Sequence, residues 1–348
     1  MQRRNFFVSL GLFFASLLIT VSCTQSPPLD ESPTTATSGD EAKPVVMGFS
    51  AWPGWFPWQV AQEAGIFEAS GATVDLRWFD GYLDSLNALV AEQLDANTQT
   101  LNDTISSVAV GSDQVIVLVN DNSTGNDKII VSDEINSIED LKGKTIAVEE
   151  GTVDHFLLLL GLEKAEISPD EVTVQPLETG AAAAAFVAGQ VDAVGVFAPF
   201  TTKALEREGS KELFSSADFP GAIPDHLVVS RQLIEERPEQ VQALVDSWFA
   251  TLQFIEENQD EAYEMMAKRA GVSIEEYKEY DAGTTIFSLE DNLKAFQPGE
   301  DMTALPYAAE KISDFLLENE LIQEKPDLSQ LFDDRFVKAY SESQGSAS

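Results

Sequence analysis

One seven-residue pattern occurs twice in this chain. Residues 90–96 have the sequence VAEQLDA, and residues 187–193, which follow 97 positions later, have the sequence VAGQVDA. A small-residue stretch with helical character precedes each copy, at 83–89 and 180–186, and a short β-prone run follows each, at 97–101 and 194–197. A helix-then-strand unit that recurs indicates two similar α/β lobes, each with its own sheet, facing each other across a cleft.

The remaining segments predict the contents of each lobe. β-prone runs indicate strands at 45–49, 73–79, 114–120 and 227–230 for the first lobe, and at 128–131 and 144–148 for the second. Helices between successive strands are typical of a mostly parallel sheet. From Gln232 onward the chain reads as amphipathic helices, which we expect to pack on the first lobe. Two crossings, near 120–126 and 220–225, would form a two-stranded hinge, and such hinges favour closure about a ligand.

The N-terminal residues have the features of an export signal. Arg3 and Arg4 precede an apolar run at 6–21, which is shorter than the roughly 20 residues that a membrane-spanning helix needs. We interpret residues 1–22 as the signal peptide and residues 23–43 as a flexible linker. The junction resembles a bacterial lipoprotein signal, although Thr20 stands where that signal usually has Leu.

The lipoprotein resemblance implies that Cys23 is acylated. The protein would then be anchored to a membrane in the periplasm, or at the surface of a bacterium that has one membrane; simple secretion is the alternative. Cys23 is the only cysteine in the chain, so an intrachain disulfide and a thiolate metal site are excluded. The formal net charge is -38, and loss of Arg3 and Arg4 would make it -40 (-38 - 2). Such a surface repels nucleic acid, which we do not expect as a partner.

In open α/β sheets ligands bind beyond the carboxyl ends of the strands, so the turns that follow the strands predict the cleft lining. The turn at 50–58 holds Trp52, Trp55 and Trp58, three of the five tryptophans. Breaks at Pro53-Gly54 and Pro57 indicate a rigid loop, whose indole faces are suited to stacking. The alternative for any one ring is hydrophobic packing between lobes or helices.

The same turns are acidic and contain no Lys or Arg. Across 50–58, 79–82, 99–104, 120–126, 149–154, 178–180 and 197–200 the acids are Asp80, Asp103, Asp121, Glu149, Glu150, Asp154 and Glu178. Aromatic faces together with carboxylates suit a planar organic cation, which stacks on the rings and donates paired N-H bonds to the acids. The alternative for Asp80 and Asp103 is a helix N-cap. A helix N-terminus could still hold an anion through backbone N-H groups.

Catalysis has little support in the sequence. His155 and His226 are the only histidines, and they lack the spacing of a metal pair, so core or hinge packing is the simpler interpretation. Nucleotide-binding and nucleophile motifs are absent from the sequence. We therefore expect a protein that is not an enzyme and has no cofactor and no metal. An enzyme that uses the same cleft remains the alternative.

Several segments, in order, carry a resemblance to a known class. They are 48–50, 59–67, 91–96, 141–148, and 192–193 followed by 199–200. In these the chain resembles the solute-binding proteins of the nitrate, sulfonate and taurine class of ABC importers. The resemblance implies an α/β, two-lobed periplasmic binding protein fold (type II-like) with a two-stranded hinge. The first lobe would comprise 44–121 plus 225–340, and the second 122–224. Implied partners are the permease and ATPase subunits, and we expect a monomer.

A narrower resemblance rests on 52–55, 79–82, 100–104 and 120–127. In these segments the chain is similar to the branch associated with urea carboxylase, which implies guanidinium as the ligand. Oxyanions such as aliphatic sulfonates, taurine or nitrate are the rival ligands, and urea is a third. The predicted ligand-binding residues are Trp52, Trp55, Phe79, Asp80, Gln99, Asn102, Asp103, Asp121, Glu150, Thr152, Asp154 and Phe197.

Overall fold

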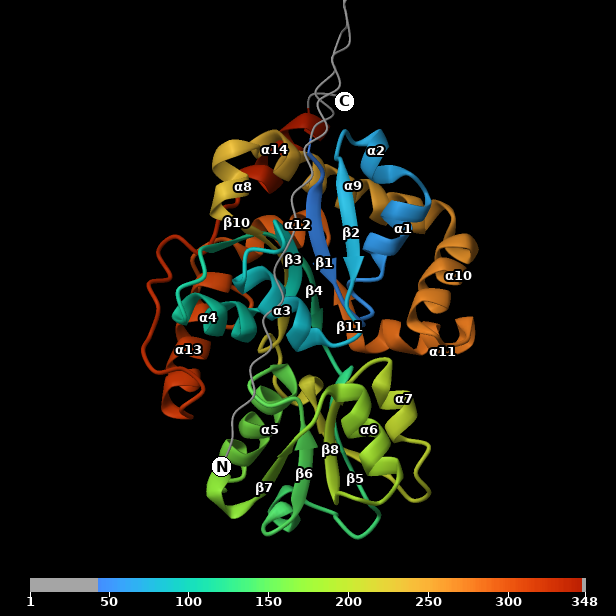
Figure 1. Ribbon diagram of the computed structural model, residues 1–348, viewed down its shortest axis with the longest axis vertical. Coiled ribbons are helices and arrows are strands. Elements are labelled where there is room, and N and C mark those ends of the chain that lie inside the picture. Colours follow the sequence, from blue (N-terminus) through green and yellow to red (C-terminus); the bar gives the residue numbers. More distant parts are fainter. Residues whose placement is uncertain (1–42, 346–348) are drawn as a thin grey trace, which may run out of the picture. The chain divides into compact units, whose positions relative to one another are not determined.

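The computed structural model describes residues 43–345, so the predicted signal peptide and Cys23 lie outside the described residues. Two sheets organise the chain (Figure 1). The first has the strand order β11 (Thr284–Ile286), β4 (Gln114–Ser123), β10 (Pro224–Ser230), β3 (Ala96–Thr100), β1 (Val45–Phe49) and β2 (Val74–Trp78). The second has the order β7 (Thr173–Pro176), β6 (Thr145–Val148), β8 (Ala193–Phe197), β5 (Asp127–Val131) and β9 (Lys211–Ser215).

Most strands of each sheet run in one direction, as the sequence predicts. In the first sheet β1 is parallel to β2 and β3, while β10 is antiparallel to both β3 and β4, and β11 is antiparallel to β4. In the second sheet β6 is parallel to β7 and β8, while β5 is antiparallel to β8 and β9. The carboxyl ends of β1, β3 and β8 can therefore contribute to one cleft.

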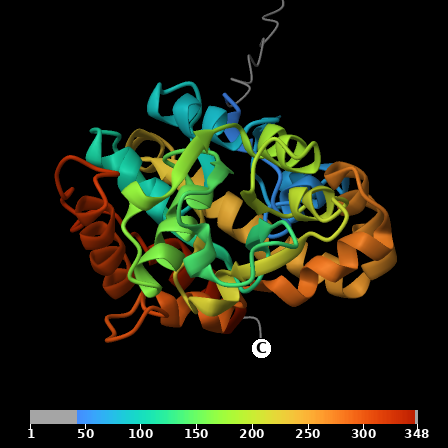
Figure 2. The ribbon, with the colours of Figure 1, turned by 90° about the horizontal axis from the view of Figure 1, so that it is seen from below.

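Helices flank both sheets, and we use the word lobe for a sheet with its helices. The first lobe carries α1 (Pro57–Glu63), α2 (Ile66–Ala69), α3 (Tyr82–Val90), α4 (Leu101–Ala109), α8 (Arg231–Glu236), α9 (Pro238–Glu257), α10 (Gln259–Ala270), α11 (Ile274–Glu279), α12 (Leu289–Ala295), α13 (Leu305–Glu318) and α14 (Arg335–Gly345). The second carries α5 (Val153–Lys164), α6 (Thr179–Val187) and α7 (Phe200–Ala204). Figure 2 shows α10 and α11 on one flank and α13 on the other.

The repeated pattern has the same structural role in both lobes. Asp95, at the end of the first copy, accepts a hydrogen bond from the Val46 N-H, and Asp192, its counterpart, accepts one from the Thr145 N-H, both at 2.9 Å. Each aspartate thus ties its strand to the neighbouring parallel strand, β1 or β6. The two copies also turn alike, because Glu92 has φ 57° and Gly189 has φ 70°. The sequence repeat therefore reflects two α–β units that are built in the same way.

Two chain segments join the sheets within residues 43–345. One is the turn between β4 and β5, and the other runs from η3 (Ser216–Asp218) to β10. They are joined to each other, because the Ser123 hydroxyl lies 2.7 Å from that of Ser216 and the Ser123 N-H donates to the Ile223 carbonyl at 2.9 Å.

The predicted turn at 120–126 is wrong in its first half. β4 continues through Ser123, because β10 pairs with it on one side and β11 on the other. Backbone hydrogen bonds from both neighbours hold these polar residues in the sheet. The predicted turn at 99–104 is also absent, since α4 begins at Leu101, directly after β3 ends at Thr100. No helix among residues 43–345 is apolar and long enough to cross a membrane.

Candidate functional site

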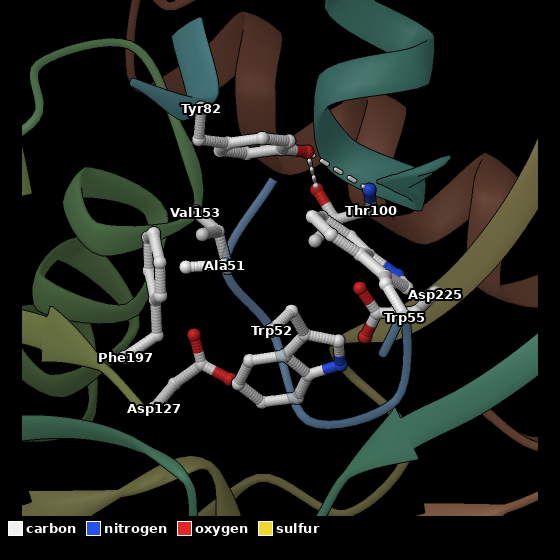
Figure 3. A pocket seen from close by; sticks show the side chains of 9 residues that line it. All are labelled: Ala51, Trp52, Trp55, Tyr82, Thr100, Asp127, Val153, Phe197 and Asp225. Carbon is white, nitrogen blue, oxygen red and sulfur yellow. Dashed lines mark hydrogen bonds between the residues drawn. The ribbon is translucent and has the colours of Figure 1, made fainter. Parts of the chain in front are cut away.

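A small cavity lies where the strand ends of the two lobes meet (Figure 3). The first lobe contributes the loop after β1, the start of α3, the end of β3 and the start of β10, and the second contributes the start of β5, the start of α5 and the end of β8. Its lining is Ala51, Trp52, Trp55, Tyr82, Thr100, Asp127, Val153, Phe197 and Asp225. The space free of protein atoms is about 220 Å³, but the centre of a water-sized sphere can reach only about 10 Å³ of it.

Four aromatic rings surround this cavity in a closed circuit. Trp52 lies 6.4 Å from Trp55 between ring centroids, and Trp55 lies 5.3 Å from Tyr82. Phe197, from the second lobe, completes the circuit at 6.2 Å from Tyr82 and 6.4 Å from Trp52. The contacts at Phe197 are edge-on, with interplanar angles of 87° and 79°. We call these four residues the aromatic cage.

The hinge strand β4 fixes the orientation of the tryptophan loop. The Trp52 indole N-H donates to Asp121 Oδ1 at 2.9 Å, and both side chains are buried. Asp121 also requires a glycine at position 54, because a Cβ there would lie 1.8 Å from Asp121 Oδ2. The Tyr277 hydroxyl donates to the Pro53 carbonyl at 3.0 Å, which holds the other side of the loop. These contacts hold both sides of the loop, whereas Pro57, predicted as a break within it, begins α1.

Buried carboxyl groups gather at the cavity. Asp127 and Asp225 line it, and Asp103, Asp121 and Asp154 lie around it. Each of these five is at most 2% exposed. One carboxylate oxygen on four of them has no hydrogen-bond partner among the described residues, and these atoms are Asp121 Oδ2, Asp127 Oδ2, Asp154 Oδ1 and Asp225 Oδ2. Buried polar atoms are nearly always satisfied, so these four oxygens are suited to a hydrogen-bond partner that a bound molecule supplies.

Burial raises the pKa of each of these carboxyl groups. It raises the pKa of Asp103 and of Asp127 to about 7 and that of Asp121 to about 8. The pKa of Asp225 is raised well above its usual value by burial and then by the charges of Asp121, Asp127 and Asp103. The pKa of Asp154 is raised likewise by burial and then by charges, among which that of Asp127 has the largest effect. The cluster thus stores mutual repulsion when it is ionised.

The cavity lining contains no Lys or Arg. The cation that acts on the cluster is Lys128, which lowers the pKa of Asp127, but its ammonium group pairs with Glu212 outside the cavity. Within residues 43–345 no group of three or more His, Cys, Asp or Glu side chains is arranged to hold a metal ion. The site therefore combines flat aromatic faces with buried carboxyl groups that have no cationic side chain beside them in the lining.

The structure brings some of the predicted residues together and separates others. Trp52, Trp55 and Phe197 line the cavity, whereas Phe79 packs beside Gly48. Asp80 is exposed and accepts the Trp78 indole N-H at 2.7 Å. It does not line the cavity, and it is not an N-cap, since Gly81 holds that position of α3.

Glu150 and Gln99 also lie outside the cavity. Glu150 is exposed and borders a separate surface depression with Glu178. The Gln99 amide is buried and donates to Thr104 and Gln114 at 2.9 and 2.8 Å, so its donors are used within the first lobe. Trp58 is a core residue, stacked on Phe67 at 5.9 Å.

The remaining predicted residues form a layer behind the lining. Thr100, which lines the cavity, donates to Asp103 Oδ2 at 2.7 Å, and Asn102 donates to Asp103 Oδ1 at 2.9 Å. The Tyr82 hydroxyl lies 3.3 Å from Thr100 Oγ1 and accepts the Thr100 N-H at 3.0 Å. The Thr152 hydroxyl donates to the Glu149 carbonyl at 2.8 Å. Asp103 therefore acts on the cavity through Thr100 and Tyr82.

Sequence reasoning missed four lining residues that carry polar atoms or a ring: Tyr82, Thr100, Asp127 and Asp225. Asp127 and Asp225 lie on strands that enter or leave the hinge, not in a strand-to-helix turn. A signal existed, since Asp127 directly follows one predicted hinge crossing, 120–126, and Asp225 is the last residue of the other, 220–225. His226 is fully buried in β10, where burial lowers its pKa to about 3, which fits the interpretation of a hinge histidine.

Comparisons with known proteins place the chain in a family. The model of the NMT1-like family matches residues 38–271. A protein of Brucella abortus (strain 2308) described as a binding protein is 29% identical over 231 residues, 65% of this chain and 71% of its own. The taurine-binding periplasmic protein of Escherichia coli (strain K12) is 33% identical over 198 residues, 55% of this chain and 60% of its own.

Solved structures share the fold. The alkanesulfonate-binding protein SsuA from Xanthomonas axonopodis pv. citri, bound to MOPS, superposes with a TM-score of 0.71 at 19% identity, over 83% of this chain and 98% of that one. The desulfurization enzyme DSZB superposes with a TM-score of 0.61 at 18% identity, over 86% and 99%. The fold is thus that of the periplasmic binding proteins, although one neighbour is an enzyme. Because the family model covers 234 (271 - 38 + 1) of the 348 residues, the chain belongs to the NMT1-like family.

Proposed function

We propose that this protein is the substrate-binding component of an ABC importer and that its ligand is guanidinium. Family membership and fold support the coarser part, a small-molecule receptor that serves a permease and an ATPase. In this proposal residues 44–121 plus 225–340 form one lobe and 122–224 the other, and the ligand is held between them. The predicted anchor at Cys23 would keep the receptor at the membrane, outside the cytoplasm.

The assignment of guanidinium as the ligand rests on the cluster of buried carboxyl groups. A guanidinium group is flat, stays charged at any physiological pH and offers N-H donors in its own plane. Asp127 and Asp225 come from different lobes, and each has an unpartnered oxygen at the cavity. A cation between them would satisfy these oxygens and relieve the repulsion that raises the pKa of Asp225. The four rings of the aromatic cage would cover its faces and edges.

Cavity size supports a compact ligand. Only about 10 Å³ is open to the centre of a water-sized sphere, which is about the space of one water molecule. The bare guanidinium ion has four heavy atoms in one plane, so the lining side chains must move apart slightly to admit it. A long alkyl tail would require a much larger separation of the lobes, because Val153, Phe197 and Tyr82 close the sides.

Relatives described as binding taurine or aliphatic sulfonates make an oxyanion the main rival. A sulfonate at this site would face Asp127 and Asp225 with no Lys or Arg in the lining. Such an arrangement adds repulsion to groups that are already costly to ionise. The cavity chemistry therefore favours a cation over an anion.

Urea is the second candidate ligand, and the indole N-H of Trp55 is the group that favours it. The buried indole N-H of Trp55 has no acceptor among the described residues, and guanidinium cannot supply one. The urea carbonyl could accept that bond, while its amide groups donate to the carboxyl oxygens. Urea carries no charge, so its affinity should not rise with ionisation of the acids, whereas that of guanidinium should.

A ligand panel tests the proposal. Thermal shift and calorimetry would compare guanidinium, methylguanidine, urea, nitrate, taurine and alkanesulfonates, because a ligand of the native state raises apparent stability. We expect guanidinium to give the largest shift. Asp225→Asn should weaken its binding tenfold or more, and Asp170→Asn, an exposed aspartate outside the cavity, should not. Tight taurine or sulfonate binding without guanidinium binding would overturn the assignment.

Catalysis at this site is tested separately, because the desulfurization enzyme DSZB has the same fold. We propose that the protein binds without chemical change, since the lining offers no thiol and no imidazole. Incubating the purified protein with guanidinium or urea and measuring released ammonia checks this directly. Ammonia formed at a rate proportional to protein concentration, and lost in Asp225→Asn, would establish an enzyme instead.

A further inference from the structure

The first turn of α3 lacks a cap from its own lobe. The first N-H groups of any helix have no acceptor within that helix. Gly81 is the N-cap of α3 and has no side chain to supply one. The Leu83 N-H instead donates to Glu149 Oε1 at 3.3 Å. Glu149 follows β6 in the second lobe, so a carboxylate from one lobe satisfies a helix donor of the other.

The sequence repeat shows that this arrangement is unusual. With the 97-residue offset of the repeat, Gly81 corresponds to Glu178, the N-cap of α6. Glu178 caps its own helix, because its carboxylate accepts the Gly180 and Ala181 N-H groups at 2.9 and 3.0 Å. The second lobe therefore has a local cap at the position where the first lobe has glycine. The helix α3 depends on Glu149 for what α6 obtains within its own lobe.

Hydrogen bonds in the second lobe hold Glu149 in place. Its Oε2 atom accepts from the Thr179 hydroxyl at 3.0 Å, and the same hydroxyl lies 2.9 Å from Asp154 Oδ2. A threonine hydroxyl has one hydrogen, so it donates to one carboxyl and accepts from the other. One of the two acids is then protonated. Asp154 is the more deeply buried of the two, and we assign the proton to it. Burial raises the pKa of Glu149 to about 7, so the carboxylate that suits a helix cap is its predominant form above that pH.

A reciprocal contact joins the lobes at α5. Its N-cap, Thr152, makes no side-chain cap bond. The Val153 N-H, in the first turn of α5, helps to lower the pKa of Asp103, which belongs to the first lobe. Nearby, Phe156 of α5 packs edge-on against Phe315 of α13 at 5.2 Å. The two lobes are thus in contact at α5, through Phe156, as well as at α3 through Glu149.

We propose that Glu149 is a positioning residue that holds the two lobes closed by capping α3 across the cleft. The bond exists only while the lobes are together, so it favours the closed state without touching the ligand. Its loss would speed opening. The role in ligand retention rests on the proposed function, but the contact itself does not, and two measurements separate them.

Amide hydrogen exchange tests the contact without any ligand. Exchange at the Leu83 N-H would be followed by NMR in the wild type, Glu149→Ala and the matched control Glu150→Ala, an exposed neighbour of the same charge. The Gly180 and Ala181 N-H groups, capped by Glu178, serve as internal references. We expect exchange at Leu83 to accelerate roughly 2- to 30-fold in Glu149→Ala, the range for loss of an N-cap, and to stay unchanged in Glu150→Ala. Equal exchange at Leu83 in all three proteins would overturn the proposal.

Stopped-flow dissociation of guanidinium tests retention. We expect faster dissociation in Glu149→Ala than in the wild type or Glu150→Ala. Glu149→Gln should lie between, because its amide oxygen can still accept from Leu83 while the charge is lost. If Glu149→Ala does not fold, the dissociation rate of Glu149→Gln is compared with that of the wild type instead.

A compensating variant separates capping from lobe closure. The backbone at Gly81 is extended, with φ -101° and ψ 131°, a conformation that residues other than glycine also adopt. The substitution Gly81→Ser would therefore give α3 a side-chain cap from its own lobe. In the double variant Gly81→Ser/Glu149→Ala we expect slow exchange at Leu83 but fast dissociation. Slow dissociation in the double variant would mean that Glu149 only stabilises α3. If the wild type binds no guanidinium, the ligand assignment fails, and the exchange result still decides the contact.

Discussion

The affinity for guanidinium should rise steeply with pH between 6 and 8. The ligand keeps its charge over this range, so any change comes from the protein. Asp127 lines the cavity with a pKa of about 7, and Asp225, beside it, has a pKa raised well above its usual value. Only the ionised carboxylates can pair with a cation, and the protonated forms must lose their protons first.

The magnitude follows from the fraction of each acid that is ionised. A group with a pKa of about 7, such as Asp127, is roughly 9% ionised at pH 6 and roughly 91% at pH 8. Apparent affinity scales with the competent fraction, so one such group changes the dissociation constant about tenfold, or about 1.4 kcal/mol. If the second carboxylate must ionise as well, the change approaches about 100-fold. At pH 7 Asp127 alone should release about half a proton per guanidinium bound, and ionisation of Asp225 would add up to about one more.

Calorimetry at pH 6, 7 and 8 measures both quantities. Titrations in phosphate and in Tris, whose ionisation enthalpies differ, give the number of protons released. Urea is the matched control, because a neutral ligand gains nothing from ionised acids. Guanidinium affinity that is flat or falls from pH 6 to 8, with no proton released, would refute the assignment of Asp127 and Asp225 as its partners.

Four further outcomes follow from the same geometry. Without ligand the melting temperature should fall as pH rises from 5 to 8: the folded-state pKa values of Asp103, Asp121 and Asp127 lie above the unfolded value, so their stabilisation is complete below about pH 4 and is lost progressively up to about pH 7 to 8. A melting temperature that rises over that range contradicts this. At pH 8 Asp225→Asn should raise the melting temperature of the free protein while weakening guanidinium binding, and differential scanning calorimetry checks the gain. Trp52→Phe keeps a ring but loses the bond to Asp121, and we expect about a fivefold loss of affinity by calorimetry; an unchanged value would mean that the bond does not orient the cage. Asp80→Asn should leave affinity within about twofold, because its carboxylate is exposed and bonded to Trp78, whereas a tenfold loss would restore the assignment made from sequence.

The fold was predictable where local patterns decide it. The repeat identified both α–β units because the same aspartate, Asp95 or Asp192, makes the same bond in each. Prediction failed at Asn120 to Ser123, where four polar residues resemble a turn. Their strand conformation comes from β10 and β11, which lie more than 100 residues further along the chain. Such long-range pairing leaves no local signal.

The site was predictable in kind but only partly in detail. The rule that ligands lie beyond strand ends identified Trp52, Trp55 and Phe197, because their place depends on topology. It failed for Asp80, whose direction is set by the Trp78 indole, a contact that spacing does not reveal. It missed Asp127 and Asp225 because the hinge strands, and not only the turns, supply cavity acids.

The position of these acids on the hinge strands suggests how one fold can bind ligands of opposite charge. Asp121 and Asp225 are partners in register on β4 and β10, the strands next to the lobe crossing. Their backbone groups are satisfied by the sheet whatever their side chains are, so the scaffold leaves the sign of charge at this position free. A cation that pairs with Asp225 and Asp127 would bind a residue of each lobe at once, so the ligand charge itself would draw the lobes together. The same geometry with basic side chains at these positions would close on an anion. Selectivity in this chain would then depend on a few hinge carboxylates, and exchanging them is the shortest route to changing its ligand.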